Sequence, residues 1–152
     1  MKNFSDLLAI NADIEIKISV TPICNNGNPR CRILINDQVC YDDVLSGAQH
    51  LSSRVGLNDA ICITVEMSDK VYSQERETAV VIDQIAIDGF DLIPDCTHLA
   101  HYENDQSVQT GPVSYLGFNG TWTLDIKEPF YRWRHRVTGQ GWLLEPTTKS
   151  LD

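Results

Sequence analysis

Hydrophobic and polar residues alternate with a period of two along most of the chain. The segment 14–20, "IEIKISV", has isoleucine or valine at every even position, with Glu15, Lys17 and Ser19 between them. Successive side chains of a β-strand point to opposite faces, so this pattern predicts a strand with one buried face. Similar alternation, or a run of β-branched residues, predicts further strands at 31–35, 60–67, 79–87, 121–126 and 130–137.

Turn residues separate these segments. Asn36-Asp37-Gln38 predicts a tight turn inside "CRILINDQVCYDDVL", and Asp88-Gly89 predicts another after 79–87. Only "MKNFSDLLAI" and "SGAQHLSSRVG" have the character of a short helix, and the weakly periodic stretch 96–120 is expected to be a long loop or an extended connection. Many short strands with turns between them predict an antiparallel sandwich or barrel.

The length of 152 residues fits a single domain. Within it we expect a β-sandwich body with a short N-terminal segment at 1–110. A Trp- and Arg-rich part follows at 111–152, made of strands or an arm that packs on the body or on a neighbouring molecule.

The charge balance restricts the partners. The formal net charge of −9 argues against general nucleic-acid binding, which depends on Lys and Arg neutralising phosphates. No apolar run approaches the length of a membrane span, and the first residues lack the continuous apolar core of a signal peptide. We therefore expect a soluble protein that is made in a cytoplasm and binds neither nucleic acid nor membranes.

The sequence holds no motif of a known reaction. GxSxG, HExxH, the P-loop and GxGxxG are all absent, so no catalytic residue and no cofactor is predicted, and the protein is expected not to be an enzyme. His98 and His101 lie three residues apart beside Glu103 and Asp105. A metal site there needs further ligands to converge, and two loop histidines with ordinary hydrogen bonds are the favoured alternative, so no metal site is predicted.

The cysteines show no CxxC pair and no spacing typical of zinc sites. Without an export signal they are expected to be free thiols, buried or half-buried, although a Cys24–Cys31 bridge across a turn is geometrically possible. The five are Cys24, Cys31, Cys40, Cys62 and Cys96.

The C-terminal part gathers large aromatic and basic residues. The segment 130–137, "FYRWRHRV", read as a strand, places Arg132, Arg134 and Arg136 on one face and Trp133 on the other. Arg and Trp dominate the energetics of protein interfaces, so we predict a partner-binding site of Arg132, Trp133, Arg134, Arg136 and Trp142. A solvated strand face is the alternative for the arginines. Trp133 and Trp142 could each instead be core residues or platforms for stacking a sugar.

Part of the chain resembles a known kind of module. The segment 61–92, "ICITVEMSDKVYSQERETAVVIDQIAIDGFDL", resembles the back half of the jelly-roll module of calcium-dependent xylan-binding domains, in which a strand, an "ND" dipeptide, a variable loop and a "DRNL" segment precede a strand ending in "I.V.G". Here "VIDQIAIDG" matches that last strand, and the resemblance covers roughly residues 13 to 93. It implies an all-β fold, an antiparallel jelly-roll-like β-sandwich with an extended C-terminal segment.

The calcium and sugar residues of that family are poorly kept. Ser68-Asp69 stands at the "ND" position and Glu77-Thr78-Ala79 at "DRN", so only Asp69 and Glu77 keep an oxygen ligand. Calcium takes six to eight oxygens, and no calcium site is predicted.

The C-terminal third resembles another group of proteins. The segment 115–146, which contains "GFNGTW", is similar to small virion proteins of tailed bacteriophages, particularly contractile-tailed phages of cyanobacteria. The resemblance implies a non-enzymatic virion structural protein, made in the host cytoplasm, that contacts other virion proteins and copies of itself. The alternative function is a carbohydrate-binding module on the virion surface that uses Trp133 or Trp142 as its sugar platform.

Overall fold

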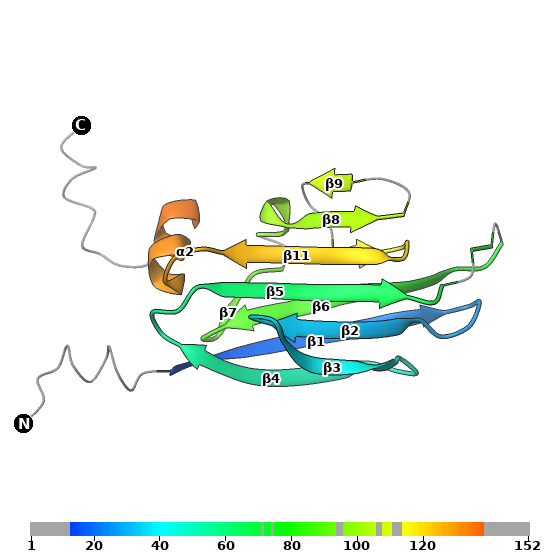
Figure 1. Cartoon of the computed structure of the whole chain (residues 1–152), viewed down its shortest axis with the longest axis horizontal. Helices are drawn as coiled ribbons and strands as arrows, with labels where there is room; N and C mark the ends of the chain where they lie inside the picture. Colours follow the sequence, from blue (N-terminus) through cyan, green and yellow to red (C-terminus); the bar gives the residue numbers. More distant parts are fainter. Residues whose placement is uncertain are drawn as a thin grey trace, which may run out of the picture.

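The protein is a sandwich of two antiparallel β-sheets (Figure 1). The computed structural model describes residues 13–70, 72–73, 75–93, 96–105, 108–110 and 114–138. One sheet has the strand order β10-β6-β1-β4, with β7 paired to β6, and the other has the order β3-β2-β5-β11-β8-β9. The predicted all-β sandwich is confirmed. The strands are β1 (Asp13–Cys24), β2 (Arg30–Ile35), β3 (Gln38–Val44), β4 (Gln49–Gly56), β5 (Ile61–Ser68), β6 (Thr78–Ile87), β7 (Phe90–Asp91), β8 (His101–Asn104), β9 (Val108–Thr110), β10 (Tyr115–Leu116) and β11 (Gly120–Ile126).

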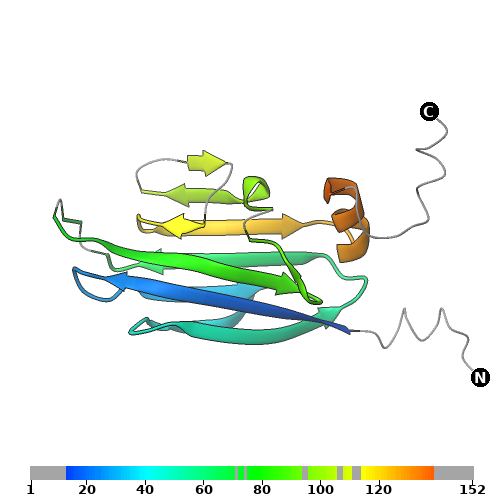
Figure 2. The same ribbon diagram turned by 180° about the vertical axis from the view of Figure 1, so that it is seen from behind.

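The predicted alternation generates the core. The even positions of β1 from residue 14 to residue 20 are buried, and β5 buries its odd positions from 61 to 67. Side chains of the two sheets meet in one hydrophobic cluster, which also contains Trp122 and Leu124 of β11. Figure 2 shows the sandwich from behind, with β1 and β6 side by side in the nearer sheet. Burial of this apolar surface stabilises the fold at roughly 25 cal/mol per Å².

Both predicted turns are present. Asn36 and Asp37 have φ angles of 50° and 65° between β2 and β3, and Asp88 and Gly89 have φ angles of 50° and 85° between β6 and β7. Asn and Asp tolerate this left-handed region better than other side chains, and Gly adopts it without a steric cost.

Two expectations for irregular or helical segments are wrong. The stretch 46–56, expected as a possible helix, contains strand β4, which pairs with β1 from Gly56↔Asp13 to Gln49↔Val20. Pairing with the free edge of β1 overrides its weak local preference. The stretch 96–120, expected as a long loop or extended connection, contains the 3₁₀-helix η1 (Thr97–Leu99) and strands β8, β9 and β10. The possible helix at 1–10 lies outside the described residues.

The predicted strand at 130–137 is also wrong, because these residues form the helix α2 (Phe130–Thr138). Phe130, Trp133 and Val137 are spaced by three and four residues, which places them on one helical face. Phe130 and Trp133 belong to the core cluster, and their rings lie 6.1 Å apart. Pro129 precedes the helix, where its fixed φ and missing N–H are tolerated. Within the described part of the chain, no helix is long and apolar enough to cross a bilayer.

The arginines therefore do not form a ladder. On a helix, residues two positions apart point in widely different directions and residues four apart lie on one face, so Arg132 and Arg136 share a face that Arg134 does not. Arg132 is exposed, Arg134 lies 3.8 Å from the ring centre of Phe90, and Arg136 donates to Glu128 at 2.6 Å. Trp133 is only 3% exposed, so it is a core residue. Trp142 lies outside the described residues.

The position of Trp133 gives a direct test of α2. Trp133→Ala is expected to lower the free energy of unfolding by about 3–5 kcal/mol, because it leaves a cavity under the helix. Arg132→Ala, one residue earlier and exposed, is expected to change it by less than about 0.5 kcal/mol. Urea unfolding followed by circular dichroism measures both. Equal effects of the two substitutions would contradict the helical packing.

Candidate functional site

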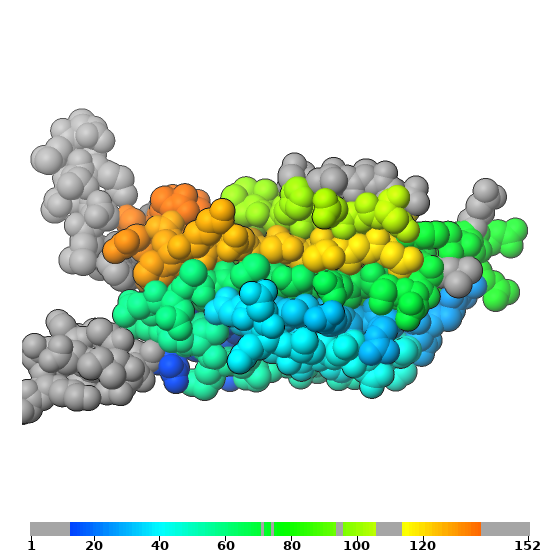
Figure 3. Space-filling view, in the orientation of Figure 1, coloured from blue at the N-terminus to red at the C-terminus, as the bar shows by residue number. Residues whose placement is uncertain are grey.

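A pocket of about 400 Å³ lies at the end of the sandwich away from α2. Its walls come from the connection between β5 and β6, which projects beyond the sheets at the right of Figure 3, and from residues on β8, on β10 and just before β11. β5 ends at Ser68, beside the beginning of β11. The β5–β6 connection therefore lies close to the connection between β10 and β11. Among its lining residues are Lys70, Tyr72, Tyr115 and Phe118.

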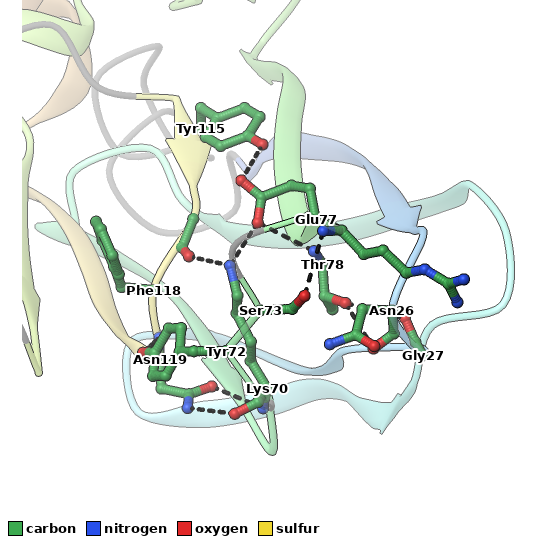
Figure 4. A network of polar contacts seen from close by, with 12 residues as sticks. Asn26, Gly27, Lys70, Tyr72, Ser73, Glu77, Thr78, Tyr115, Phe118 and Asn119 are labelled. Carbon is green, nitrogen blue, oxygen red and sulfur yellow. Dashed lines mark hydrogen bonds and ion pairs between the residues drawn. The ribbon is translucent and has the colours of Figure 1, made fainter.

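A buried ammonium group forms the floor of the pocket. The Lys70 side chain is only 5% exposed. Its Nζ donates to Glu77 Oε1 and to the carbonyl oxygen of Gly117, both at 2.5 Å (Figure 4). It also lies 5.2 Å from the ring centre of Tyr72 and 5.9 Å from that of Phe118. A carboxylate, a carbonyl and two aromatic rings thus replace the water that this charge loses on burial.

The backbone of Lys70 is held just as closely. The side-chain oxygen of Asn119 accepts from the Lys70 N–H at 2.9 Å, and the Asn119 Nδ2 donates to the Lys70 carbonyl at 3.1 Å. One amide side chain therefore satisfies both backbone groups of Lys70, as a neighbouring strand would. This bridge joins the β5–β6 connection to the residues that precede β11.

Glu77 is the anion of the site. Burial by itself raises the pKa of Glu77, but the hydrogen bonds from Lys70 and Tyr115, the charge of Lys70 and the Thr78 N–H outweigh it and hold that pKa below its ordinary value. The Tyr115 Oη donates to Glu77 Oε2 at 2.7 Å. Burial, followed by this contact with Glu77, raises the pKa of Tyr115 to about 12. Glu77 is therefore a carboxylate, and Tyr115 is a neutral phenol, at neutral pH.

Aromatic rings form the open side of the pocket. Tyr72, Tyr115 and Phe118 are all exposed, Tyr72 to 43%. The rings of Tyr72 and Phe118 lie 6.0 Å apart at a 48° angle. Tyr72 donates to Asp105 at 2.6 Å and accepts from the Asn119 N–H at 2.9 Å, so its position is fixed although its face is open.

The wall of the pocket that contains Gly117 and Phe118 is held in place by a buried residue. The hydroxyl of the buried Tyr102 donates to the carbonyl oxygen of Phe118 and accepts from the Phe118 N–H at 3.0 Å. At Gly120 the strand β8 passes so close that an added Cβ would lie 2.4 Å from the Glu103 carbonyl oxygen. Only glycine fits there, and this close approach positions residues 117–119.

The residues predicted from the sequence lie elsewhere. Arg132, Trp133, Arg134 and Arg136 are on α2, at the opposite end of the sandwich (Figure 1). Trp133 is buried and cannot stack on a sugar. The aromatic residues of the pocket were missed because no periodicity marks them. The sequence did contain one signal that could have pointed to these residues. Lys70, Tyr72 and Phe118 each follow a strand and lie inside the two stretches that resemble known proteins.

Comparison with known proteins supports the fold through solved structures, whereas the comparisons by sequence found no match. No protein-family model matches the chain, and no curated protein matches it. Solved structures with a similar fold include the selenomethionine form of vCBM60, described with two families of calcium-dependent carbohydrate-binding modules, at a TM-score of 0.51 and 14% identity over 74% of this chain and 91% of that chain. They also include vCBM60 in complex with galactobiose, at a TM-score of 0.52 and 14% identity over 73% and 97%. The fold is thus a jelly-roll-like sandwich similar to that of these carbohydrate-binding modules.

A calcium ion does not fit the described residues of this pocket. Within the described residues, no group of three or more His, Cys, Asp or Glu side chains could hold a metal ion. Both oxygens of Glu77 accept hydrogen bonds, one from Lys70 and one from Tyr115. The ammonium of Lys70 would also repel a cation bound at Glu77.

The depressed pKa of Glu77 predicts a pH dependence. Its stabilising effect is present above the ordinary carboxyl pKa and is lost as the pH falls through the lower pKa of the folded state. Glu77→Gln is therefore expected to lower the free energy of unfolding by about 1 kcal/mol at neutral pH, after allowance for the partial exposure of Glu77. The difference in the free energy of unfolding between this variant and the wild type should narrow as the pH falls below the ordinary carboxyl pKa.

Urea unfolding of both proteins at several pH values measures this narrowing. Glu75→Gln, on the same connection but exposed, is the matched control and should change stability by less than about 0.5 kcal/mol at every pH. A penalty for Glu77→Gln that stays constant down to acid pH would contradict the ion pair.

Proposed function

We propose that the chain is a non-catalytic glycan-binding module and that the pocket at the β5–β6 connection is its binding site. The observation that carries this proposal is the combination of exposed, fixed aromatic rings with buried polar groups in one cavity. Binding sites for small molecules have this composition, with apolar walls and a few placed polar groups. No reaction is implied, since Glu77 and Lys70 neutralise one another.

The chemistry of a sugar matches this composition. A pyranose has faces of C–H groups and an equator of hydroxyl groups. The faces of Tyr72 and Phe118 can cover the C–H groups, and aromatic side chains contribute large apolar area with little loss of conformational entropy. The Lys70 ammonium and the Ser73 hydroxyl, both lining the pocket, can bond the hydroxyl groups.

The comparison supports the same function. vCBM60, which shares the fold, binds galactobiose. At 14% identity this similarity does not transfer a ligand, but it makes galactobiose a suitable first probe. The glycan role was the alternative interpretation of the sequence, although the sequence assigned it to Trp133 or Trp142 rather than to this pocket.

Removal of the aromatic wall tests the proposal. Tyr72→Ala and Phe118→Ala are each expected to weaken glycan binding about tenfold, because a buried aromatic contact contributes about 1–2 kcal/mol. Isothermal titration calorimetry with galactobiose, followed by a panel of oligosaccharides, measures the affinity.

Phe90→Ala is the matched control. Phe90 is also exposed, but it lies beside α2 at the other end of the sandwich, so affinity should not change. The proposal is wrong if no oligosaccharide binds, or if the Tyr72 and Phe118 variants bind like the wild type.

A structural role in a phage virion is the second candidate function. It is supported by the sequence resemblance of the C-terminal third and by the exposed position of Arg132 on a helix at the end of the sandwich. In this role the protein, made in the host cytoplasm, would contact other virion proteins or its own copies through α2.

Substitution of the three arginines of α2 tests the virion role. Arg132→Ala, Arg134→Ala and Arg136→Ala combined are expected to leave the fold intact and to reduce incorporation into particles, since an interfacial arginine contributes about 2 kcal/mol or more. Quantitative mass spectrometry of purified particles measures incorporation. Normal incorporation of a folded triple variant would contradict the role.

A further inference from the structure

The pocket contains its own cation. The Lys70 side chain is 5% exposed and lines the cavity, and its Nζ points toward Glu77 (Figure 4). A lysine ammonium usually stays in water, because burial of an ion costs several kcal/mol unless other groups compensate. Here Glu77, Gly117 and two aromatic rings supply that compensation.

Among the described residues, the Lys70 ammonium has hydrogen-bond acceptors for two of its donors. An ammonium group carries three N–H donors. One is directed to Glu77 Oε1 and one to the Gly117 carbonyl, while the Tyr72 and Phe118 rings approach Nζ only at 5.2 and 5.9 Å. This leaves one donor, on a nitrogen close to the Tyr72 and Phe118 rings, for a hydroxyl group of a ligand.

Glu77 holds this cation in place and is not available for another. Its two oxygens bond Lys70 and Tyr115, and the Thr78 N–H donates to the same oxygen as Lys70, at 3.0 Å. A divalent ion that bound Glu77 would lie beside the Lys70 ammonium, which is 2.5 Å from Glu77 Oε1 and would repel it. The described residues supply no further group of acidic, His or Cys ligands to compensate.

We propose that the Lys70 ammonium is the fixed cation of this glycan site, so that the site binds sugar without calcium, in contrast to the calcium-dependent modules that share its fold. This inference rests on the proposed glycan-binding function. Lys70 supplies one charged hydrogen bond to a hydroxyl oxygen of the sugar. Because Glu77 neutralises the Lys70 charge, the ligand class is a neutral glycan rather than an acidic one.

The test compares binding with and without metal. Galactobiose and a panel of neutral oligosaccharides are titrated into the full chain by calorimetry, once in EDTA and once in millimolar calcium. We expect the same affinity in both conditions. Binding that needs calcium would overturn the inference and leave the glycan function standing, whereas no binding in either condition would overturn both.

A second variant tests the role of Lys70 itself. Lys70→Met keeps an unbranched side chain, one atom shorter than that of lysine, and removes the charge. It is expected to reduce glycan affinity at least about tenfold, with no recovery in calcium. A Lys70→Met protein that binds as tightly as the wild type would overturn the inference.

A measurement without sugar covers the case in which Lys70→Met does not fold. Ligands that bind only the native state raise the melting temperature. The wild-type chain is expected to melt at the same temperature in calcium and in EDTA. A rise in calcium that Glu77→Gln abolishes would show that Glu77 holds a metal ion, and would overturn the inference.

Discussion

The burial of one charged side chain organises the end of the sandwich. An ammonium group as enclosed as that of Lys70 is stable only where fixed acceptors replace its water. The acceptors come from two separate parts of the chain, Glu77 just before β6 and Gly117 before β11. The hydrogen bonds of the Lys70 ammonium therefore join the β5–β6 connection to the β10–β11 connection. The two hydrogen bonds between Asn119 and the Lys70 backbone join the same two connections. The exposed rings of Tyr72 and Phe118 lie on these two joined connections, close to the Lys70 ammonium.

The pairing of strands in the sheet determines where these two connections meet. β5 and β11 are neighbours in one sheet, and Met67 is paired with Gly120, so the end of one strand lies beside the beginning of the other. The close packing of β8 on Gly120 and the buried Tyr102 hydroxyl then fix the residues between β10 and β11. Connections that carry function on a rigid scaffold are common in β-sandwiches. At the opposite end, α2 covers the core and plays no part in the pocket.

The sequence predicts the scaffold better than the site. Alternation in β1, β5 and β11 reports burial of one strand face, so these strands and the two tight turns could be found from local pattern alone. β4 could not, because its pairing with β1 decides its structure. In 130–137 the arginines recur every second residue, and this pattern concealed the helical spacing of Phe130, Trp133 and Val137. The Lys70–Glu77 pair is only 7 positions apart, but the pocket also depends on distant contacts such as that of Lys70 with Gly117, 47 positions away, which no local pattern encodes.

A crystal structure of the full chain with galactobiose, grown in EDTA, tests the central claim most directly. The account predicts a sugar ring against Tyr72 and Phe118, with one of its hydroxyl oxygens accepting a hydrogen bond from the Lys70 Nζ while Glu77 keeps its contact with that ammonium. A sugar bound at another surface, or a Lys70 side chain displaced from Glu77 and Gly117 into solvent, would contradict it.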